Sequence, residues 1–343
     1  MGMDIAGVQG LWDPMPGWLD TASYGLPPRP AFEDLQRALA DWRVGRTSWR
    51  PWNDATTRAR AAFATMMGVP GEDVMVGATV SQMLAPVASS LPPGSRVVLP
   101  EEEFTSNLFP WAVSADVRTV PLDHLAEAVD AGTRVVAFSL VQSADGRLAP
   151  VDDILSAARA HDALVAVDAS QACGWLPVDA SRFDVLVCGA YKWLMAPRGA
   201  AYGYLSPRAR AGMRPTAANW YAGSDPGGSF YGPPLRLAQD ARAFDLSPAW
   251  FCQVGAAPAL ELLNEIGIEA VHAHDTALAA RFLTALDREP TGSAIVTVDF
   301  PDAERRLEAA GIRSSVRAGK VRASFHLYTT PDDVDQAVKA LTA

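Results

Sequence analysis

Residues 163–192 read ALVAVDASQACGWLPVDASRFDVLVCGAYK and hold two apolar runs of strand length, each followed by a charged residue. The first run ends at Asp168, and Lys192 lies just beyond the second. Runs without polar alternation are typical of strands buried on both faces, as in a parallel sheet covered by helices. If the two strands are neighbours, the carboxylate and the amine meet at the carboxyl edge of the sheet, where ligands of such folds bind.

The same pattern extends on both sides of this stretch. Apolar runs alternate with helical patterns between residues 55 and 205, and the runs cover 73–78, 95–100, 133–141, 163–170, 183–190 and 200–206. This alternation predicts an α/β fold whose large, mainly parallel sheet is sandwiched by helices. A segment rich in glycine, proline and serine (223–234) separates it from two helices, a small antiparallel sheet and a terminal helix. We therefore expect a large domain over 18–225 and a smaller α+β domain over 235–343, with 1–17 packing on the latter.

Composition narrows the class of protein and its partners. The apolar fraction is 49% and the charged fraction 20%, as in soluble globular proteins. A net charge of −10 argues against non-specific nucleic-acid binding, which needs a basic face. No apolar stretch reaches the length of a membrane span, and the N-terminus lacks the regions of a signal peptide. We expect a cytoplasmic enzyme with reduced thiols and a small-molecule substrate, and no nucleic-acid or membrane partner.

Lysine is rare in this chain. Of 29 basic residues only Lys192, Lys320 and Lys339 are lysines. A desolvated lysine can lose its proton and form a Schiff base with a carbonyl, which a guanidinium cannot do. The aldehyde cofactor that uses such a lysine is pyridoxal 5′-phosphate, whose ring nitrogen needs a carboxylate partner. Lys192 and Asp168 fit these two roles, although a helix cap at Asp168 or a simple ion pair remains an alternative.

Two further positions fit the same cofactor. Gln171, one helical turn after Asp168, is placed to donate to the phenolate oxygen of the cofactor. The stretch VGATVSQ (76–82) is a turn of small residues between a strand and a helix. The backbone amides of Gly77 and Ala78 and the hydroxyl of Thr79 are candidates for binding its phosphate. Because many strand–helix turns have this composition, an ordinary turn remains the alternative.

The order of these motifs resembles the class V aminotransferase family of pyridoxal-phosphate enzymes. The elements are the turn with Thr79, then EEFTSNLFPW (102–111), VDASQACG (167–174), YKWLMAPRG (191–199) and RASFHLYTTPDDVD (322–335). The family includes cysteine desulfurases, kynureninases and isopenicillin N epimerase-like proteins, and the resemblance spans roughly residues 18–340. It implies the fold-type I architecture and a homodimer with active sites near the subunit interface.

The resemblance also implies roles for single residues. Lys192 stands at the position of the Schiff-base lysine, Asp168 at that of the ring-nitrogen partner, and Gln171 at that of the phenolate partner. Phe104 falls where the family places a ring stacked on the cofactor, with core packing as the alternative, and Asn107 is expected to line the pocket.

Other matching positions concern the phosphate and the substrate. Tyr191 precedes the lysine and is expected to reach the phosphate, whereas Gly189 replaces a serine that binds phosphate in some relatives. Arg322 looks like the arginine that pairs with the substrate α-carboxylate, which suits its planar fork. Arg317 is a second candidate, and a surface arginine on a strand is the alternative for both.

One departure from the family pattern is informative. Desulfurases commonly carry a nucleophilic cysteine on a loop before the RASF strand, whereas VRAGKVRASF (316–325) contains no insert and no cysteine. Cys173, Cys188 and Cys252 all lie in apolar surroundings and are expected to be small buried residues. A persulfide-forming desulfurase is therefore disfavoured. The five histidines form no HExxH pattern, so no metal site is expected.

These observations predict a pyridoxal-phosphate enzyme that forms an external aldimine with an α-amino acid and removes its Cα proton through Lys192. Aminotransferase-type chemistry is the family default. A β-lyase acting on the C–S bond of a cysteine conjugate and an epimerase are the alternatives, and a non-catalytic binding protein of the same fold is a remote one. The tryptophan-rich segment 42–52 is interpreted either as packing or dimer contact or as a lid or wall over the substrate. The loop 219–232 is interpreted as a mobile loop or as a contact with the cofactor phosphate of the partner subunit.

Overall fold

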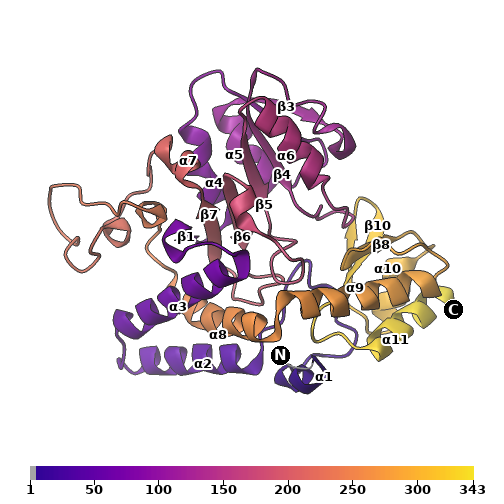
Figure 1. The fold of residues 1–343 in the computed structure, drawn as a ribbon. Coiled ribbons are helices and arrows are strands. Elements are labelled where there is room, and N and C mark those ends of the chain that lie inside the picture. Colours follow the sequence, from indigo (N-terminus) through magenta and orange to yellow (C-terminus); the bar gives the residue numbers. More distant parts are fainter. Residues whose placement is uncertain (1–4) are drawn as a thin grey trace.

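A seven-stranded sheet forms the centre of the computed structural model, which describes residues 5–343 (Figure 1). The strand order is β1-β7-β6-β5-β4-β2-β3. Neighbouring strands are parallel from β6 to β3, and β7 runs antiparallel to both β6 and β1. The strands are β1 (Val74–Gly77), β2 (Arg96–Pro100), β3 (Asp116–Val120), β4 (Thr133–Ser139), β5 (Leu164–Asp168), β6 (Val185–Gly189) and β7 (Ala201–Leu205). This sheet confirms the predicted fold class.

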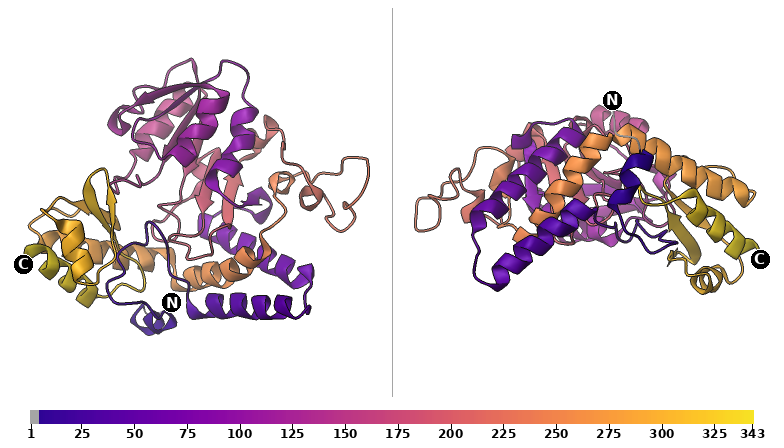
Figure 2. Two further views of the ribbon diagram at one scale, coloured as in Figure 1. Left: turned by 180° about the vertical axis from the view of Figure 1, so that it is seen from behind. Right: turned by 90° about the horizontal axis from the view of Figure 1, so that it is seen from below.

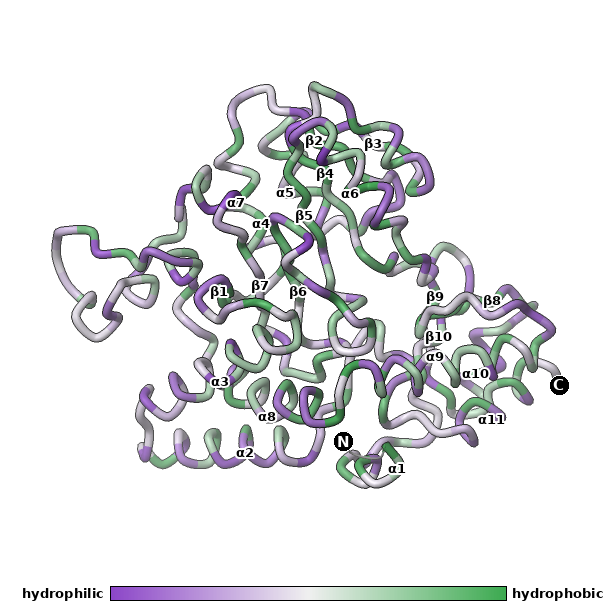
Figure 3. Tube along the Cα trace, viewed as in Figure 1, coloured by the Kyte–Doolittle hydropathy of each residue, from purple (hydrophilic) through white to green (hydrophobic). Residues whose placement is uncertain are grey.

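Helices cover both faces of the sheet. Successive residues of a strand point to opposite faces, so Val74 and Val76 belong to one buried cluster and Met75 to another. The first cluster includes α3 (Trp49–Met67), α6 (Val151–Ala160) and α8 (Trp250–Ile266), and the second includes α4 (Val80–Ser89), α5 (Thr105–Ser114) and α7 (Pro207–Ala211). Figure 3 shows the strands as largely hydrophobic segments within this sandwich. Burial on both faces explains why the strands lack polar alternation.

A second, smaller sheet lies in the C-terminal part of the chain (Figure 2). It contains β8 (Ile295–Val298), β9 (Ser315–Arg317) and β10 (Lys320–Ser324), which pair antiparallel in the order β8-β10-β9. A third buried cluster joins it to α9 (Ile268–Ala285), α10 (Ala303–Ala309) and α11 (Pro331–Thr342). Between β9 and β10 the turn is only two residues long, and both have positive φ, 47° at Ala318 and 77° at Gly319.

The N-terminal segment runs along this C-terminal part (Figure 2). After α1 (Ile5–Val8), the side chain of Gln9 donates to the carbonyl of Leu327 at 3.0 Å. Farther along, Leu19 belongs to the third buried cluster, and Asp20 forms an isolated bridge with Ser324. The expectation for residues 1–17 includes residues 1–4, which lie outside the described part of the chain.

The position of helix α8 affects the expected boundary between the two domains. It follows residue 235, yet its buried side chains pack with α3 and with α2 (Arg29–Arg43), and Leu260 and Leu263 lie in the first cluster. The division into 18–225 and 235–343 stays a prediction, and α8 is the element on which it depends.

Local structure differs from the sequence expectation in two places. The strand β3 was not anticipated, because its residues DVRTV are mostly exposed at the sheet edge. Residues 170–175 form turns rather than the helix expected after Asp168, so Gln171 does not lie one helical turn on. Within the tryptophan-rich segment 42–52, α3 begins at Trp49 with Ser48 as its cap. Within residues 5–343, no helix has both the length and the apolar character needed to span a membrane.

Candidate active site

The registers of the sheet bring the sequence-predicted positions to one edge. Gly77 at the end of β1 pairs with Ala201, which also pairs with Gly189 at the end of β6. Asp168 at the end of β5 pairs with Ser139 and Val187. The turn after β1, the carboxylate after β5 and the lysine after β6 are therefore at the same end of the large sheet.

Lys192 and Asp168 are both buried. Burial lowers the pKa of the Lys192 amine to about 8, with the nearby carboxylate of Asp168 opposing and the guanidinium of Arg322 adding to this effect. Burial likewise raises the pKa of Asp168, which is opposed by hydrogen bonds from Ser170, whose backbone amide donates to Asp168 Oδ1 at 2.8 Å. The site thus holds an amine that loses its proton far more readily than an exposed lysine.

The backbone of Lys192 is tightly enclosed. A Cβ atom on Gly25 would lie 1.8 Å from the Lys192 carbonyl oxygen, so only glycine allows the N-terminal segment to pass here. The Gly25 amide donates to the Tyr191 carbonyl at 3.0 Å, and the Met195 amide donates to the Lys192 carbonyl at 3.0 Å. Met195 adopts a φ of 55°, which is costly for a residue with a side chain. These contacts fix the chain on both sides of the lysine.

Phe104 lies opposite the lysine. It precedes α5, is 47% exposed, and its ring centroid is 5.8 Å from Lys192 Nζ. A partly exposed ring beside a buried amine is suited to stacking on a flat ligand. Phe104 therefore lies at the site rather than in the core.

Glu103 is a site residue that the sequence did not reveal, because it is the last of three consecutive glutamates, a pattern typical of a solvated surface. Its carboxylate is buried and accepts from the Phe104 amide at 3.0 Å, the Ser139 amide at 2.8 Å and the Ser139 hydroxyl. Burial raises its pKa, and the charge of Asp168 adds to the effect. Glu103 links the backbone of Phe104 to the strand end beside Asp168.

Gln171 and Asn107 are both buried near these groups. Gln171 donates to the Ala22 carbonyl at 3.0 Å and accepts from the indole of Trp193 at 2.8 Å, which leaves one of its N–H groups for another partner. Asn107 accepts from the Trp111 indole at 3.2 Å, and its Nδ2 has no hydrogen-bond partner among residues 5–343. A buried amide donor without a partner is costly unless a ligand provides one.

The turn after β1 has the expected form of a helix N-terminus. Thr79 caps α4, and its hydroxyl accepts from the Gln82 amide at 3.3 Å. The Ala78 amide donates to Gln82 Oε1 at 3.2 Å. A Cβ atom on Gly77 would lie 2.7 Å from Gln82 Oε1 and from Met83 Cγ, so any larger residue here would displace these two side chains of α4. Free amides at such a helix start attract anions.

Tyr191 and Gly189 are linked by packing. A Cβ atom on Gly189 would lie 3.2 Å from Cε1 of Tyr191, so the Tyr191 ring lies against the position where some relatives carry serine. On the ring lies the guanidinium of Arg198, 4.9 Å from its centroid, and Arg198 donates to the Tyr24 hydroxyl at 2.9 Å. Neither Arg198 nor Tyr24 was anticipated as part of this cluster.

Arg322 approaches the site from β10 and is almost completely buried. It donates to the Ser143 carbonyl at 2.5 Å, the Ser23 hydroxyl at 2.8 Å and the Ser315 hydroxyl at 3.2 Å. Its one ion pair within the described residues is with Asp20, at 3.5 Å. Burial lowers the pKa of Arg322 to about 10, and the charge of Arg317 adds to this, with Asp20 opposing. This guanidinium is bound mainly by neutral oxygens, which is an unfavourable situation for a buried cation.

Arg317 lies beside it at the edge of the small sheet. It is exposed and donates to the same Ser23 hydroxyl at 3.4 Å. Ser23 therefore joins both arginines, although the sequence gave no sign of this role.

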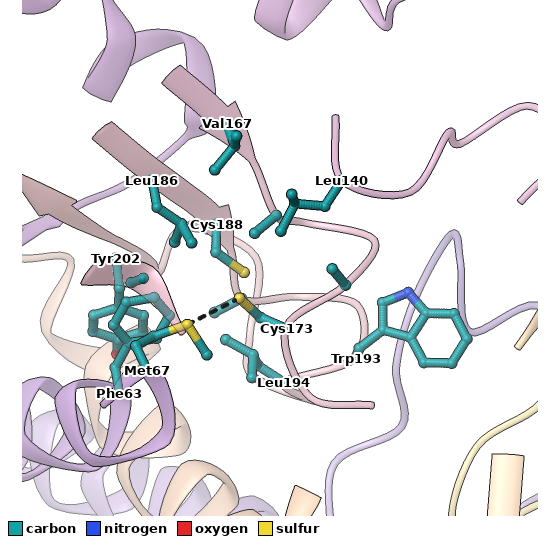
Figure 4. Close-up of a cluster of buried hydrophobic side chains, with 14 of the residues drawn as sticks. Phe63, Met67, Leu140, Val167, Cys173, Leu186, Cys188, Trp193, Leu194 and Tyr202 are labelled. Atoms are coloured by element: carbon teal, nitrogen blue, oxygen red, sulfur yellow. Dashed lines mark hydrogen bonds between the residues drawn. The ribbon is translucent and has the colours of Figure 1, made fainter. Parts of the chain in front are cut away.

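The cysteines lie away from the turn between β9 and β10. Cys173 and Cys188 are buried in the apolar cluster of Figure 4, where the thiol of Cys173 is 3.6 Å from the Met67 sulfur. Burial raises the pKa of Cys188 well above its ordinary value, and it also raises that of the half-buried Cys252. The thiols of Cys188 and Cys252 therefore resist ionisation, as expected of packing residues.

The tryptophan-rich segment and the loop after β7 contact each other. Trp49 packs against Trp220, Phe230 and Trp250, with ring centroids 5.8 to 6.4 Å apart. The segment that follows α7 projects away from the sheet (Figure 1). These aromatic residues support each other.

The fold and the lysine–aspartate pair define a pyridoxal-phosphate enzyme of fold type I. The sequence profile of the family described as "Aminotransferase class-V" matches residues 43–309, and the chain belongs to this family. The family uses pyridoxal 5′-phosphate as its cofactor. The chain is therefore a pyridoxal-phosphate-dependent enzyme, as its sequence predicted.

Two curated relatives cover almost the whole chain. An uncharacterized aminotransferase of Bacillus subtilis (strain 168), YcbU, is 26% identical over 342 residues, covering 91% of this chain and 90% of that protein. The isopenicillin N epimerase of Streptomyces clavuligerus is 28% identical over 396 residues, covering 97% of this chain and 96% of that protein. The similarity thus extends beyond the motifs.

Solved structures share the fold. The cysteine desulfurase CsdA of Escherichia coli has a TM-score of 0.83 at 19% identity, covering 99% of this chain and 98% of that chain. The cystine C–S lyase C-DES, in complex with its reaction product cysteine persulfide, has a TM-score of 0.85 at 20% identity, covering 97% and 98%. These likenesses place the large sheet and its helices in fold type I.

The residues at the sheet edge fit the cofactor. The unpartnered Nδ2 of the buried Asn107, the partly exposed ring of Phe104 and the turn between Gly77 and the start of α4 are features that a flat, anionic ligand would use. The buried amine of Lys192 beside the Asp168 carboxylate supplies the remaining donor and acceptor.

Proposed function

We propose that this enzyme carries out aminotransferase-type chemistry on an α-amino acid. The observation that carries the proposal is the placement of three buried groups: the amine of Lys192, the carboxylate of Asp168 and the guanidinium of Arg322, whose charges influence the pKa of the lysine. An amine of lowered pKa, a carboxylate and a buried arginine whose closest hydrogen-bond partners are neutral oxygens match the parts of such a reaction.

Lys192 would hold the cofactor through its amine, and Asp168 would bind the protonated ring nitrogen. Gln171 would donate its remaining N–H to the phenolate oxygen, and Phe104 would stack on the ring, with Asn107 lining the pocket. When bound, the cofactor supplies an electron sink that makes the Cα proton of an amino acid acidic.

The phosphate of the cofactor would lie at the start of α4. There the amides of Gly77 and Ala78 and the hydroxyl of Thr79 would hold it, and Gln82 would release the Ala78 amide. Tyr191 would reach it from the end of β6, which is separated from β1 by β7.

The substrate α-carboxylate would bind to the guanidinium of Arg322 and would replace the neutral oxygens that now accept its hydrogen bonds. Arg317 would add positive charge beside it. With the carboxylate held in this way, the free amine of Lys192 would take up the proton from Cα. The lowered pKa of Lys192 supports this role, because a base titrating near neutral pH is unprotonated in a useful fraction of molecules.

A second copy of the chain is the proposed partner. A groove of about 680 Å³ lies between α4 and α5 and is lined mainly by small and apolar side chains, among them Phe109, Pro110 and Val113. Val113 is 88% exposed, and the groove includes Thr105, next to Phe104. Covering this groove in a homodimer would bury apolar surface beside the site. We also propose a cytoplasmic location and the domain division given above.

The reaction type is tested by supplying amino acids with and without a keto-acid acceptor. Transamination gives product only when the acceptor is present. Thiol, pyruvate and ammonia from a cysteine conjugate without acceptor would indicate a lyase. Exchange of the Cα hydrogen with solvent and inversion of configuration would indicate an epimerase, the activity named for the relative from Streptomyces clavuligerus. Either of the last two results would replace the aminotransferase proposal.

A further inference from the structure

A histidine from the C-terminal part of the chain contacts the backbone next to Lys192. His326 follows β10 and is 0% exposed. Its Nε2 lies 3.0 Å from the carbonyl oxygen of Trp193, the residue after Lys192. Its Nδ1 lies 2.8 Å from Oδ2 of Asp275 on α9. No role in the chemistry described above requires this buried pair.

The partners of His326 determine where its protons lie. A carbonyl oxygen only accepts, so Nε2 carries a proton and donates it to Trp193. A lone pair on Nδ1 facing an ionised carboxylate would be repulsive, so a proton also lies between Nδ1 and Asp275. The ring is therefore hydrogen-bonded on both sides and is fixed in one orientation.

Asp275 is itself held in place. It is 0% exposed, and its second oxygen is 2.9 Å from Nδ1 of His274. The rings of Trp193 and Tyr328 meet the His326 ring nearly edge-on, with centroids at 5.3 and 5.6 Å. A buried carboxylate is tolerated when its oxygens receive hydrogen bonds from charged or polar donors, as these do.

Trp193 is held at both ends. Its carbonyl receives the His326 hydrogen bond, and its indole donates to Gln171 at 2.8 Å. A Cβ atom on Gly174 would lie 2.5 Å from this same carbonyl oxygen, so the carbonyl has little room to turn. The main chain on the C-terminal side of Lys192 is therefore anchored by a residue distant in the sequence.

We propose that His326 is a positioning residue that holds the backbone of Lys192 from the C-terminal part of the chain. The segment that carries His326 also carries Arg322. The lysine that acts at Cα and the arginine that binds the carboxylate would then share one rigid support. The inference rests on the proposed function, in that Lys192 is taken to carry the cofactor.

Three variants separate this role from a general loss of stability. His326→Phe keeps a buried ring but removes the hydrogen bond to Trp193. Asp275→Asn keeps that bond, because the amide can donate to Nδ1 while the neutral ring donates from Nε2. Leu283→Ala is the matched control: it creates a cavity two turns farther along α9, in the third buried cluster, and is expected to lower the Tm while leaving the His326 hydrogen bonds in place.

The holoenzyme is examined by two readouts other than turnover. One is the visible circular dichroism of the bound cofactor relative to its absorbance. The other is the rate at which excess hydroxylamine removes the visible band. We expect His326→Phe to lower the dichroism at least two-fold and to accelerate removal at least five-fold. Asp275→Asn and Leu283→Ala should stay within two-fold of wild type in both, although their Tm falls.

The inference is overturned if His326→Phe behaves like Leu283→Ala, or if Asp275→Asn shows the same changes as His326→Phe. A failure of the proposed function looks different. In that case wild-type protein has no visible band that hydroxylamine removes, or Lys192→Ala retains the band.

Discussion

The carboxylate of Glu103 accepts a hydrogen bond from the backbone amide of Ser139 at 2.8 Å, and Ser139 is the register partner of Asp168. Glu103 also accepts from the Phe104 amide. One buried side chain thus sets the distance between the ring at residue 104 and the end of β5. An ionised carboxylate suits this position, because all of its neighbours donate.

Glu103→Gln should disturb this arrangement with little change in volume. The amide offers one acceptor oxygen, so one of the donors now faces an NH₂ group and loses its partner. We expect a loss of about 1 to 3 kcal/mol in stability, measured by urea unfolding, and weaker binding of the cofactor. Glu101→Gln, at the start of the same run and exposed, is the control and should leave both unchanged. If the two variants have the same stability and the same cofactor affinity, Glu103 has no role in supporting the site.

The lowered pKa of Lys192 has a measurable effect on the protein without cofactor. Between pH 8 and 10.5 the unfolded chain holds a proton on Lys192 that the folded chain has released, so stability should rise with pH across this range. Below pH 8 the folded state carries the full cost of a buried ammonium. The fall from 10.5 to about 8 corresponds to about 3 kcal/mol.

Lys192→Met should therefore stabilise the cofactor-free protein at pH 7 by up to about 3 kcal/mol, and the gain should shrink towards pH 10.5. Urea unfolding at several pH values measures it. Lys320→Met changes an exposed lysine on β10 and should show no such gain. If Lys192→Met gives no gain at pH 7, the amine is not held in a desolvated site.

Arg322→Lys should weaken substrate binding much more than cofactor binding. Lysine cannot reproduce the fork that contacts Ser143, Ser23 and Ser315, and a charged hydrogen bond contributes about 1.5 to 3 kcal/mol. We expect KM for the amino acid to rise at least ten-fold with the visible band unchanged. Arg317→Lys, at an exposed position, should have a smaller effect. Parallel loss of cofactor and substrate affinity would contradict the role of Arg322.

Gly77→Ala tests the start of α4. The added methyl would lie 2.7 Å from Gln82 Oε1 and Met83 Cγ, so the side chains of Gln82 and Met83 must move towards the phosphate site or away from their present contacts. We expect the dissociation constant of pyridoxal 5′-phosphate to rise at least ten-fold when stripped protein is titrated with it. Gly71→Ala is the control, since a Cβ atom there would have no neighbour within 4 Å. An unchanged constant for Gly77→Ala would place the phosphate elsewhere.

Val113→Asp tests whether a second copy of the chain covers the groove between α4 and α5. A charge at the border of the groove between α4 and α5 should be tolerated in a monomer, where it stays hydrated. In a dimer interface it would lose its water, which would destabilise the dimer. Sedimentation velocity should show a dimer for wild type and a monomer for the variant. Val44→Asp, at an exposed position after α2, should remain dimeric. A monomeric wild-type protein would contradict the proposed homodimer.

The sequence predicted the large sheet well because buried parallel strands are apolar on both faces, as at residues 133–141 and 183–190. The sequence did not predict the edge strand β3, because its exposed residues are mostly polar and lack an apolar run. The proximity of Lys192 and Asp168 could be predicted because each follows one of two neighbouring parallel strands, β5 and β6. By contrast, Glu103, Ser23 and His326 act through contacts with residues far away in the sequence, and no local pattern marks such contacts.

The two-residue turn between β9 and β10 has a chemical consequence beyond its shape. Neither this turn nor the two strands that flank it contain a cysteine, so no thiol on this segment can attack a bound substrate or carry a sulfur atom away from it.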